Sequence, residues 1–98
     1  MAKLAKSLRI ATILLMSPLL PKLYVKTNCP WCEEAIDCLD KHSISFEKII
    51  VSNDAQAMKE MEAISGQSKA PTLDWDGEIL ADFGETELIT FLKKLGVY

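Results

Sequence analysis

The sequence contains few of the residues that mark specialised protein classes, and each shortage excludes one class. Only four glycines, four prolines and three cysteines occur among 98 residues. Fibrous proteins, disordered segments and disulfide-rich secreted scaffolds need far more of these residues. No arginine follows Arg9, and no cluster of basic residues follows it either, so we expect no nucleic-acid-binding surface.

The composition that remains is that of one small globular domain. Hydrophobic residues make up 49% of the chain and charged residues 26%, enough for a single core. The formal net charge of -3 is unevenly distributed along the chain. Lys3, Lys6 and Arg9 precede every acidic residue, so the part of the chain that starts at Pro21 is distinctly acidic.

The first twenty residues superficially resemble a signal peptide, because basic residues precede the apolar run 10–20. No small-residue cleavage pattern follows this run, Pro18 interrupts it, and it is too short to span a bilayer. We therefore expect residues 1–20 to be a loosely packed or dispensable extension and residues 21–98 to form the domain. Translation starting at Met16 is a second explanation of the extension. No membrane association is predicted.

The spacing of apolar residues predicts alternating strands and helices. Strands are expected over 22–26, 44–51, 71–75 and 78–81; helices over 30–41, between a cap at Asp54 and a stop at Gly66, and over 85–94. The order is β-α-β-α-β-β-α, an α/β fold with a four-stranded mixed sheet flanked by helices. The apolar end of the second strand predicts burial on both faces.

The segment K-T-N-C-P-W-C, residues 26–32, places two cysteines three residues apart. A structural disulfide, half of a metal site and a redox-active dithiol all fit this spacing. A bridge between Cys29 and Cys32 closes a very small loop and stabilises a fold little. A zinc site needs two more ligands, but there is no second C-x-x-C and His42 is the only histidine. The dithiol is therefore favoured.

The predicted position of the cysteines assigns them different roles. Cys29 lies at the N-cap of the first helix, where unpaired N–H groups and the helix dipole favour a thiolate, with Pro30 in the first turn. We predict Cys29 as the nucleophile and Cys32, one turn into the helix, as the shielded resolving thiol. Lys26 adds a nearby cation. Lys69 is either a second cation or a solvated surface lysine.

Four segments resemble the glutaredoxins of the thioredoxin superfamily from about residue 21 to residue 96. They read K-T-N-C-P-W-C, E-E-A-I-D-C-L, S-G-Q-S-K-A-P and D-G. The resemblance implies a thioredoxin-like fold and exchange between dithiols and disulfides. It also implies that Lys26 contacts a carboxylate of glutathione, and that Trp31 forms a hydrophobic wall beside the cysteines.

The resemblance extends to the far side of the site. It implies that Pro71 follows a cis peptide bond and faces the cysteines, with Ala70 pairing its backbone with a peptide-like substrate. The family usually has Thr-Val-Pro where this chain has Lys69, Ala70 and Pro71. It usually has a Gly-Gly pair and an Asp where this chain has residues 81–85, so Gly84, Glu85 and Thr86 are the candidates for holding the γ-glutamyl end of glutathione.

The resulting prediction is a monomeric, cytoplasmic dithiol–disulfide oxidoreductase that reduces protein disulfides, glutathione mixed disulfides or both. Glutathione is the expected reductant, with no metal and no tightly bound cofactor. One alternative is a glutaredoxin-like electron donor served by thioredoxin reductase. A redoxin that binds an iron–sulfur cluster is disfavoured by Pro30, and a non-catalytic binding module by the presence of both thiols. Cys38 is predicted to be a buried structural cysteine.

Overall fold

The computed structural model describes residues 20–97, which form four strands and three helices. In chain order they are β2 (Lys22–Val25), α2 (Pro30–Lys41), β3 (Glu47–Ile50), α3 (Ala55–Ser65), β4 (Thr72–Trp75), β5 (Glu78–Ala81) and α4 (Glu85–Leu95). The predicted β-α-β-α-β-β-α order is confirmed. The predicted extension over residues 1–20 lies outside the described residues, except for Leu20.

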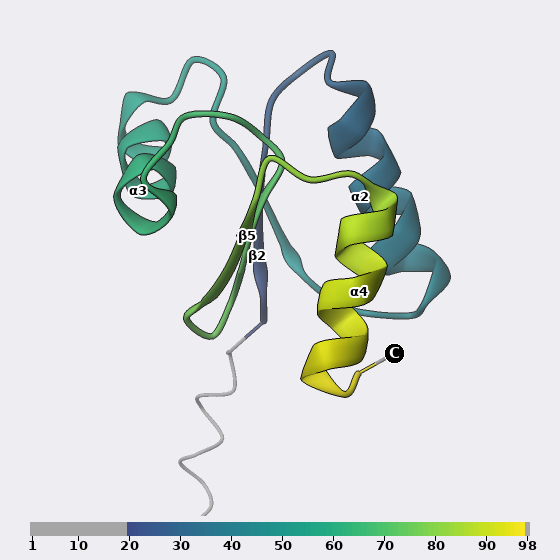
Figure 1. The fold of residues 1–98 in the computed structure, drawn as a ribbon. Coiled ribbons are helices and arrows are strands. Elements are labelled where there is room, and N and C mark those ends of the chain that lie inside the picture. Colours follow the sequence, from purple (N-terminus) through teal and green to yellow (C-terminus); the bar gives the residue numbers. More distant parts are fainter. Residues whose placement is uncertain (1–19, 98) are drawn as a thin grey trace, which may run out of the picture.

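The strands form one mixed sheet in the order β3-β2-β4-β5. β2 and β3 are parallel, as strands connected through a helix must be, and the two remaining pairs are antiparallel. Helices α2 and α4 cover one face of the sheet, and α3 covers the other (Figure 1). The predicted α/β fold with a four-stranded mixed sheet is therefore confirmed.

Turn and cap residues end the elements where the sequence predicts. Asp54 caps α3, and its carboxylate accepts a hydrogen bond of 3.1 Å from the N–H of Ala57. Gly66 ends the same helix in the left-handed conformation, at φ 73°. Asp76 and Gly77 both have positive φ, 51° and 94°, which matches the tight turn that Asp-Gly favours between antiparallel strands.

The core has two parts because side chains along the central strands alternate between the two faces of the sheet. Leu23 and Val25 of β2 pack under α2 and α4, whereas Tyr24 faces α3. The buried partners on the first face include Ala35, Cys38, Leu39, Leu73, Phe83, Leu88 and Leu92, and those on the second are Val51, Ala57 and Met61. This packing holds the start of α2 firmly against the end of β2.

The prediction that the second strand is buried on both faces is wrong. β3 begins only at Glu47, and its first two residues are exposed. Ile50 is 45% exposed. The reason is position, because β3 pairs with β2 alone and forms an edge of the sheet. The apolar run enters the core fully only at Val51, after the strand has ended.

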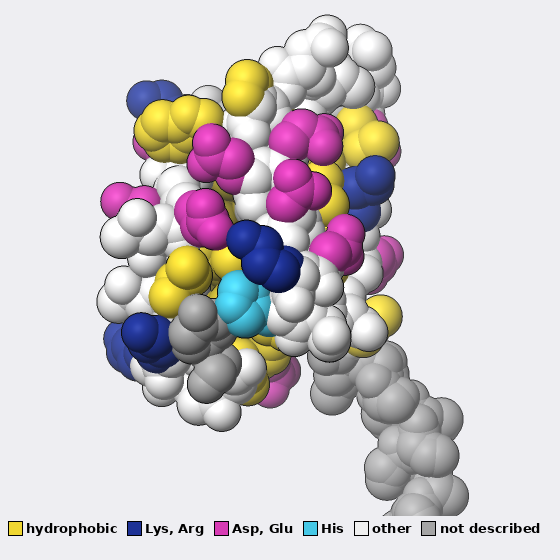
Figure 2. Space-filling model, turned by 90° about the vertical axis from the view of Figure 1, so that its right-hand side faces the viewer, with side chains coloured by type: hydrophobic (Ala, Val, Ile, Leu, Met, Phe, Trp, Pro, Cys, Tyr) yellow, Lys and Arg dark blue, Asp and Glu magenta, His cyan; other side chains and the backbone are white. Residues whose placement is uncertain are grey.

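The surface over α2 and α4 carries many acidic side chains (Figure 2). This agrees with the acidic composition of the chain after Pro21. Among residues 20–97, no helix combines the length and the apolar character needed to cross a membrane.

Candidate active site

Three loops meet at one end of the sheet, the upper end in Figure 1. The first loop follows β2, the second precedes β4 and the third follows β5. The antiparallel pairing of β4 with both neighbours requires these three ends to coincide. The first loop leads into the cysteine pair, the second contains Pro71, and the third contains Asp82.

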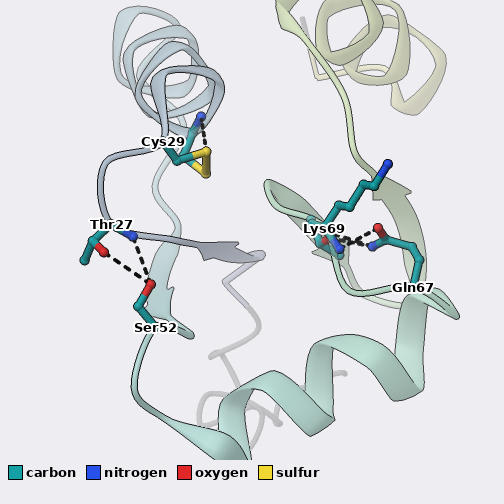
Figure 3. Close-up of a disulfide and its surroundings, with 7 residues drawn as sticks. Thr27, Cys29, Ser52, Gln67 and Lys69 are labelled. Atoms are coloured by element: carbon teal, nitrogen blue, oxygen red, sulfur yellow. Dashed lines mark hydrogen bonds between the residues drawn. A yellow bond between two sulfur atoms is a disulfide. The ribbon is translucent and has the colours of Figure 1, made fainter.

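Cys29 and Cys32 form a disulfide across the first turn of α2, with their Cα atoms 5.2 Å apart. Cys29 is the N-cap of the helix in extended backbone conformation, and its Sγ accepts the N–H of Cys32 at 3.2 Å (Figure 3). Asn28 turns the chain into this position with φ 54°, a conformation that asparagine tolerates better than most residues. The predicted N-cap is therefore confirmed.

The two sulfurs differ in access. Cys32 is 0% exposed, whereas Cys29 is only half-buried. Pro30 is the exposed first residue of α2, and Trp31 is 54% exposed beside the pair. A partner that reaches the disulfide from solvent therefore meets Cys29, next to an exposed indole.

The loop that delivers Cys29 is tied to the loop after β3. The Thr27 N–H donates to the Ser52 hydroxyl at 3.1 Å, and the two hydroxyl oxygens lie 3.3 Å apart (Figure 3). Lys26, one residue earlier, is half-buried and has no carboxylate partner within residues 20–97. The sequence did not single out Ser52, since a serine 25 residues away carries no local signal.

On the opposite side of the site, the peptide bond between Ala70 and Pro71 is cis, as the resemblance implied. Pro71 is buried, and its carbonyl accepts the N–H of Asp82 at 2.9 Å. Ala70 is half-buried and packs against both parts of the core. No hydrogen bond involves the backbone of Ala70 in the part of the chain that the structure describes.

Gln67 holds the loop just before this proline (Figure 3). Its side-chain oxygen accepts the N–H of Lys69 at 2.7 Å, and its amide nitrogen donates to the carbonyl of Lys69 at 3.1 Å. The hydroxyl of Thr72 donates to the same carbonyl at 2.9 Å. Sequence reasoning missed Gln67, although it stands in the segment S-G-Q-S-K-A-P.

The side chain of Lys69 extends away from this backbone (Figure 3) and pairs with Asp82 at 4.0 Å. Asp82 has φ 54° and occupies the turn between β5 and α4. It was also missed. The available signal was an acidic residue immediately after the second strand of the predicted hairpin, at the end of the sheet where the cysteines lie.

Two other predicted residues, Gly84 and Glu85, begin α4. Gly84 is its half-buried N-cap, and its N–H donates to the carboxylate of Glu87 at 3.0 Å. Glu85 lies 3.8 Å from Lys41, the last residue of α2, which is the helix end remote from Cys29. The carboxylate of Glu85 is thus paired with α2 rather than with Lys69.

Cys38 is a buried free thiol outside this site, as predicted. Burial raises the pKa of the thiol, the nearby Glu85 raises it further, and Lys41 acts in the opposite direction. Its sulfur lies 3.9 Å from Nδ1 of His42. Within residues 20–97, no three or more His, Cys, Asp or Glu side chains are grouped so as to hold a metal ion.

A C-x-x-C disulfide at the start of a helix, at the same end of a thioredoxin-like sheet as a cis-proline, is the arrangement of a thiol–disulfide oxidoreductase. The chain matches the Glutaredoxin family over residues 22–80. It belongs to the glutaredoxin family.

Individual proteins agree with this assignment. A glutaredoxin-like 8.6 kDa protein in the rubredoxin operon of Clostridium pasteurianum is 32% identical, covering 74% of this chain and 97% of that protein. A thioredoxin-like protein of known structure is 26% identical, with a TM-score of 0.67 over 74% of this chain and 99% of the other. A glutaredoxin from Archaeoglobus fulgidus shares the fold, with a TM-score of 0.69 at 16% identity over 83% and 94% of the chains.

Proposed function

We propose that this protein reduces disulfides in proteins and glutathione mixed disulfides, with Cys29 as the nucleophile and Cys32 as the resolving thiol. One observation carries the assignment: Cys29 is the half-exposed N-cap of α2, whereas Cys32 is 0% exposed. The helix N-terminus stabilises a thiolate at Cys29, because its sulfur already accepts the N–H of Cys32.

The first step starts from the reduced protein. The Cys29 thiolate attacks one sulfur of the substrate disulfide and forms a new S–S bond with it. The other substrate sulfur leaves as a thiolate and takes a proton from solvent. Cys29 and the attacked half of the substrate are then joined as a mixed disulfide.

In the second step, Cys32 loses its proton and attacks the sulfur of Cys29. The bond between Cys29 and the substrate breaks, and the second substrate thiol is released. The two electrons gained by the substrate come from the dithiol, which ends as the Cys29–Cys32 disulfide. That disulfide is the bond found in the structure.

The neighbouring residues supply contacts for the substrate. We assign Trp31 as a hydrophobic wall beside Cys29, with Pro30 stiffening the turn between the cysteines. The unpaired backbone of Ala70, ahead of Pro71, pairs with an extended peptide on the other side.

Glutathione is the proposed reductant, taking the protein through the same steps in reverse. Lys26 is the proposed contact for one of its carboxylates. Lys69 and Asp82, which lie 4.0 Å apart, offer a cation and an anion to its zwitterionic γ-glutamyl end, beside the backbone of Gly84. This arrangement moves the anionic role from the predicted Glu85, which pairs with Lys41, to Asp82.

The proposed working form is a cytoplasmic monomer. The cysteine pair, the cis-proline loop and the turn at Asp82 all belong to one chain. A reducing compartment suits a protein with one working thiol pair and a free buried Cys38.

The reductant is tested by regenerating the oxidised protein with either of two systems. We expect reduction by glutathione with glutathione reductase at a rate that supports turnover of a protein disulfide. Turnover only with thioredoxin reductase would replace glutathione by that enzyme as the electron source, and failure with both would refute the proposed function.

A further inference from the structure

We propose that Gln67 and Thr72 are positioning residues, which hold the backbone of Ala70 where an extended substrate pairs with it. The inference rests on the proposed function, because it concerns the peptide bound during attack by Cys29. Neither residue was predicted to belong to the site. Both act through the backbone of Lys69 rather than through contact with the reacting sulfurs.

We call the hydrogen bonds that Gln67 and Thr72 form with the backbone of Lys69 the clamp. These bonds engage both the N–H and the carbonyl of Lys69. Its N–H is bound by the Gln67 oxygen at 2.7 Å, and its carbonyl accepts hydrogen bonds from Gln67 and Thr72 at 3.1 and 2.9 Å. A residue held through both its donor and its acceptor loses rotational freedom at both adjacent peptide units. The peptide that leads from Lys69 into Ala70 is therefore fixed.

The clamp is anchored on both sides. The amide nitrogen of Gln67 also lies 3.2 Å from the hydroxyl of Thr72 and 3.0 Å from the hydroxyl of Ser65. Ser65 is the last residue of α3, and its hydroxyl oxygen lies 2.6 Å from the carbonyl oxygen of Met61 and 3.0 Å from that of Gln67, two acceptors for its single proton. The loop before the cis-proline is thus tied to a helix at one end and to β4 at the other.

Downstream of Ala70 the chain is fixed as well, since the carbonyl of Pro71 accepts the N–H of Asp82 at 2.9 Å. Ala70 lies between these two fixed points, and its own N–H and C=O bind nothing in residues 20–97. Backbone N–H and C=O groups form hydrogen bonds wherever a partner can reach them, so these two groups are open to a ligand. The clamp prepares them for a ligand backbone at little further entropic cost.

Substitution of Thr72 distinguishes a positioning role of these residues from direct contact with the substrate. It is 0% exposed, so its hydroxyl cannot reach a bound substrate, whereas Gln67 is only half-buried. Thr72→Val removes the hydroxyl and keeps the shape of the side chain. Gln67→Ala removes the amide, and Ser68→Ala is a matched control because Ser68 is exposed and makes no hydrogen bond within the described residues.

The test measures single-turnover reduction by the fully reduced full-length protein, using two disulfides. One is an extended peptide pair joined by a disulfide, and the other is cystamine, which has no peptide backbone. We expect Gln67→Ala and Thr72→Val each to raise the half-saturating peptide concentration roughly 5- to 30-fold, the factor that corresponds to one or two lost hydrogen bonds. The saturating rate and the rate with cystamine stay at the wild-type level.

Four further readouts make the expectation specific. The double variant is no worse than either single variant, since both remove one network. Thr72→Ser restores wild-type behaviour, and Ser68→Ala never departs from it. Amide hydrogen exchange at Lys69 becomes faster in Gln67→Ala. This measurement does not need the Thr72→Val variant, so it tests the inference even if that variant does not fold.

Several results would overturn the inference. An effect of Gln67→Ala without one of Thr72→Val would mean that Gln67 touches the substrate itself. Unchanged exchange at Lys69 would show that no clamp exists, and equal losses with cystamine would show general damage to the site. If the wild-type protein reduces neither disulfide, the proposed function fails instead, so the two failures are distinguishable.

Discussion

The carboxylate of Asp82 lies 4.0 Å from the ammonium group of Lys69, and so joins the turn after β5 to the loop before the cis-proline. A backbone hydrogen bond of 2.9 Å from Asp82 to Pro71 connects the same two loops. The ion pair is exposed, and exposed pairs contribute at most about 1 kcal/mol to stability. Its importance is expected in recognition of charged disulfides.

Lys69→Gln tests that expectation. We predict that the variant reacts roughly fivefold more slowly with anionic glutathione disulfide at low ionic strength, and no more slowly with cationic cystamine. The difference between the two substrates should shrink in 1 M salt, where charges are screened within a few ångströms. Stopped-flow measurement of both rates checks this. A uniform slowing of both substrates would contradict an electrostatic role.

Substitution of each cysteine separates the two proposed steps. Cys29→Ser should abolish reduction of every disulfide, because the exposed sulfur is lost and Cys32 is 0% exposed. Cys32→Ser should keep reduction of glutathione mixed disulfides and accumulate a mixed disulfide with protein substrates. Activity assays with mass spectrometry of trapped species distinguish the variants, and the reverse ranking would exchange the two roles.

Cys38 should be unreactive at neutral pH, since burial and Glu85 raise the pKa of its thiol and keep it protonated. We expect iodoacetamide at pH 7 to alkylate Cys29 in the reduced folded protein and to reach Cys38 only in denaturant. Peptide mapping identifies the modified sites. Cys38→Ser should lower the free energy of unfolding by about 1–3 kcal/mol, because it buries a more polar group. Rapid alkylation of Cys38 in the native protein would contradict this environment.

Tyr24 should make stability fall at high pH. Burial raises the pKa of its hydroxyl above 10.0, with smaller contributions from Glu60, Asp74 and Glu47. Above pH 10 the unfolded chain releases this proton first, so the stabilisation present at lower pH is lost as the pH rises towards the folded pKa.

Urea unfolding between pH 9 and pH 11 measures this loss. The wild-type free energy of unfolding should decrease more steeply than that of Tyr24→Phe, by at most about 1.4 kcal/mol per pH unit. Identical slopes would show that Tyr24 titrates alike in both states. Since both proteins share every other titrating group, the comparison isolates this hydroxyl.

Local signals made much of the fold predictable. Asp54 and Gly66 bound α3 as the sequence indicates, and the Asp-Gly pair at 76–77 forms the turn of the hairpin. The N-cap position of Cys29 followed from the Pro that comes after it. These features depend on residues within one turn of each other, and so a single sequence contains them.

Features that depend on distant parts of the chain were not predictable in the same way. The apolar run 49–51 has the composition of a buried strand, but sheet order makes β3 an edge and leaves Ile50 exposed. The pairing of Lys69 with Asp82 requires the turn after β5 to approach the cis-proline loop. The role of Gln67 depends on the direction in which its side-chain amide points, and that direction cannot be predicted from the sequence alone.

The unequal exposure of the two sulfurs also limits the order of events in a catalytic cycle. A molecule that oxidises the pair and a molecule that reduces it must both approach Cys29, since Cys32 is 0% exposed. They cannot be bound productively at the same moment. Each half-reaction therefore has to finish and its product depart before the next begins, so the protein alternates between a reduced form that reacts with the substrate and an oxidised form that reacts with the reductant.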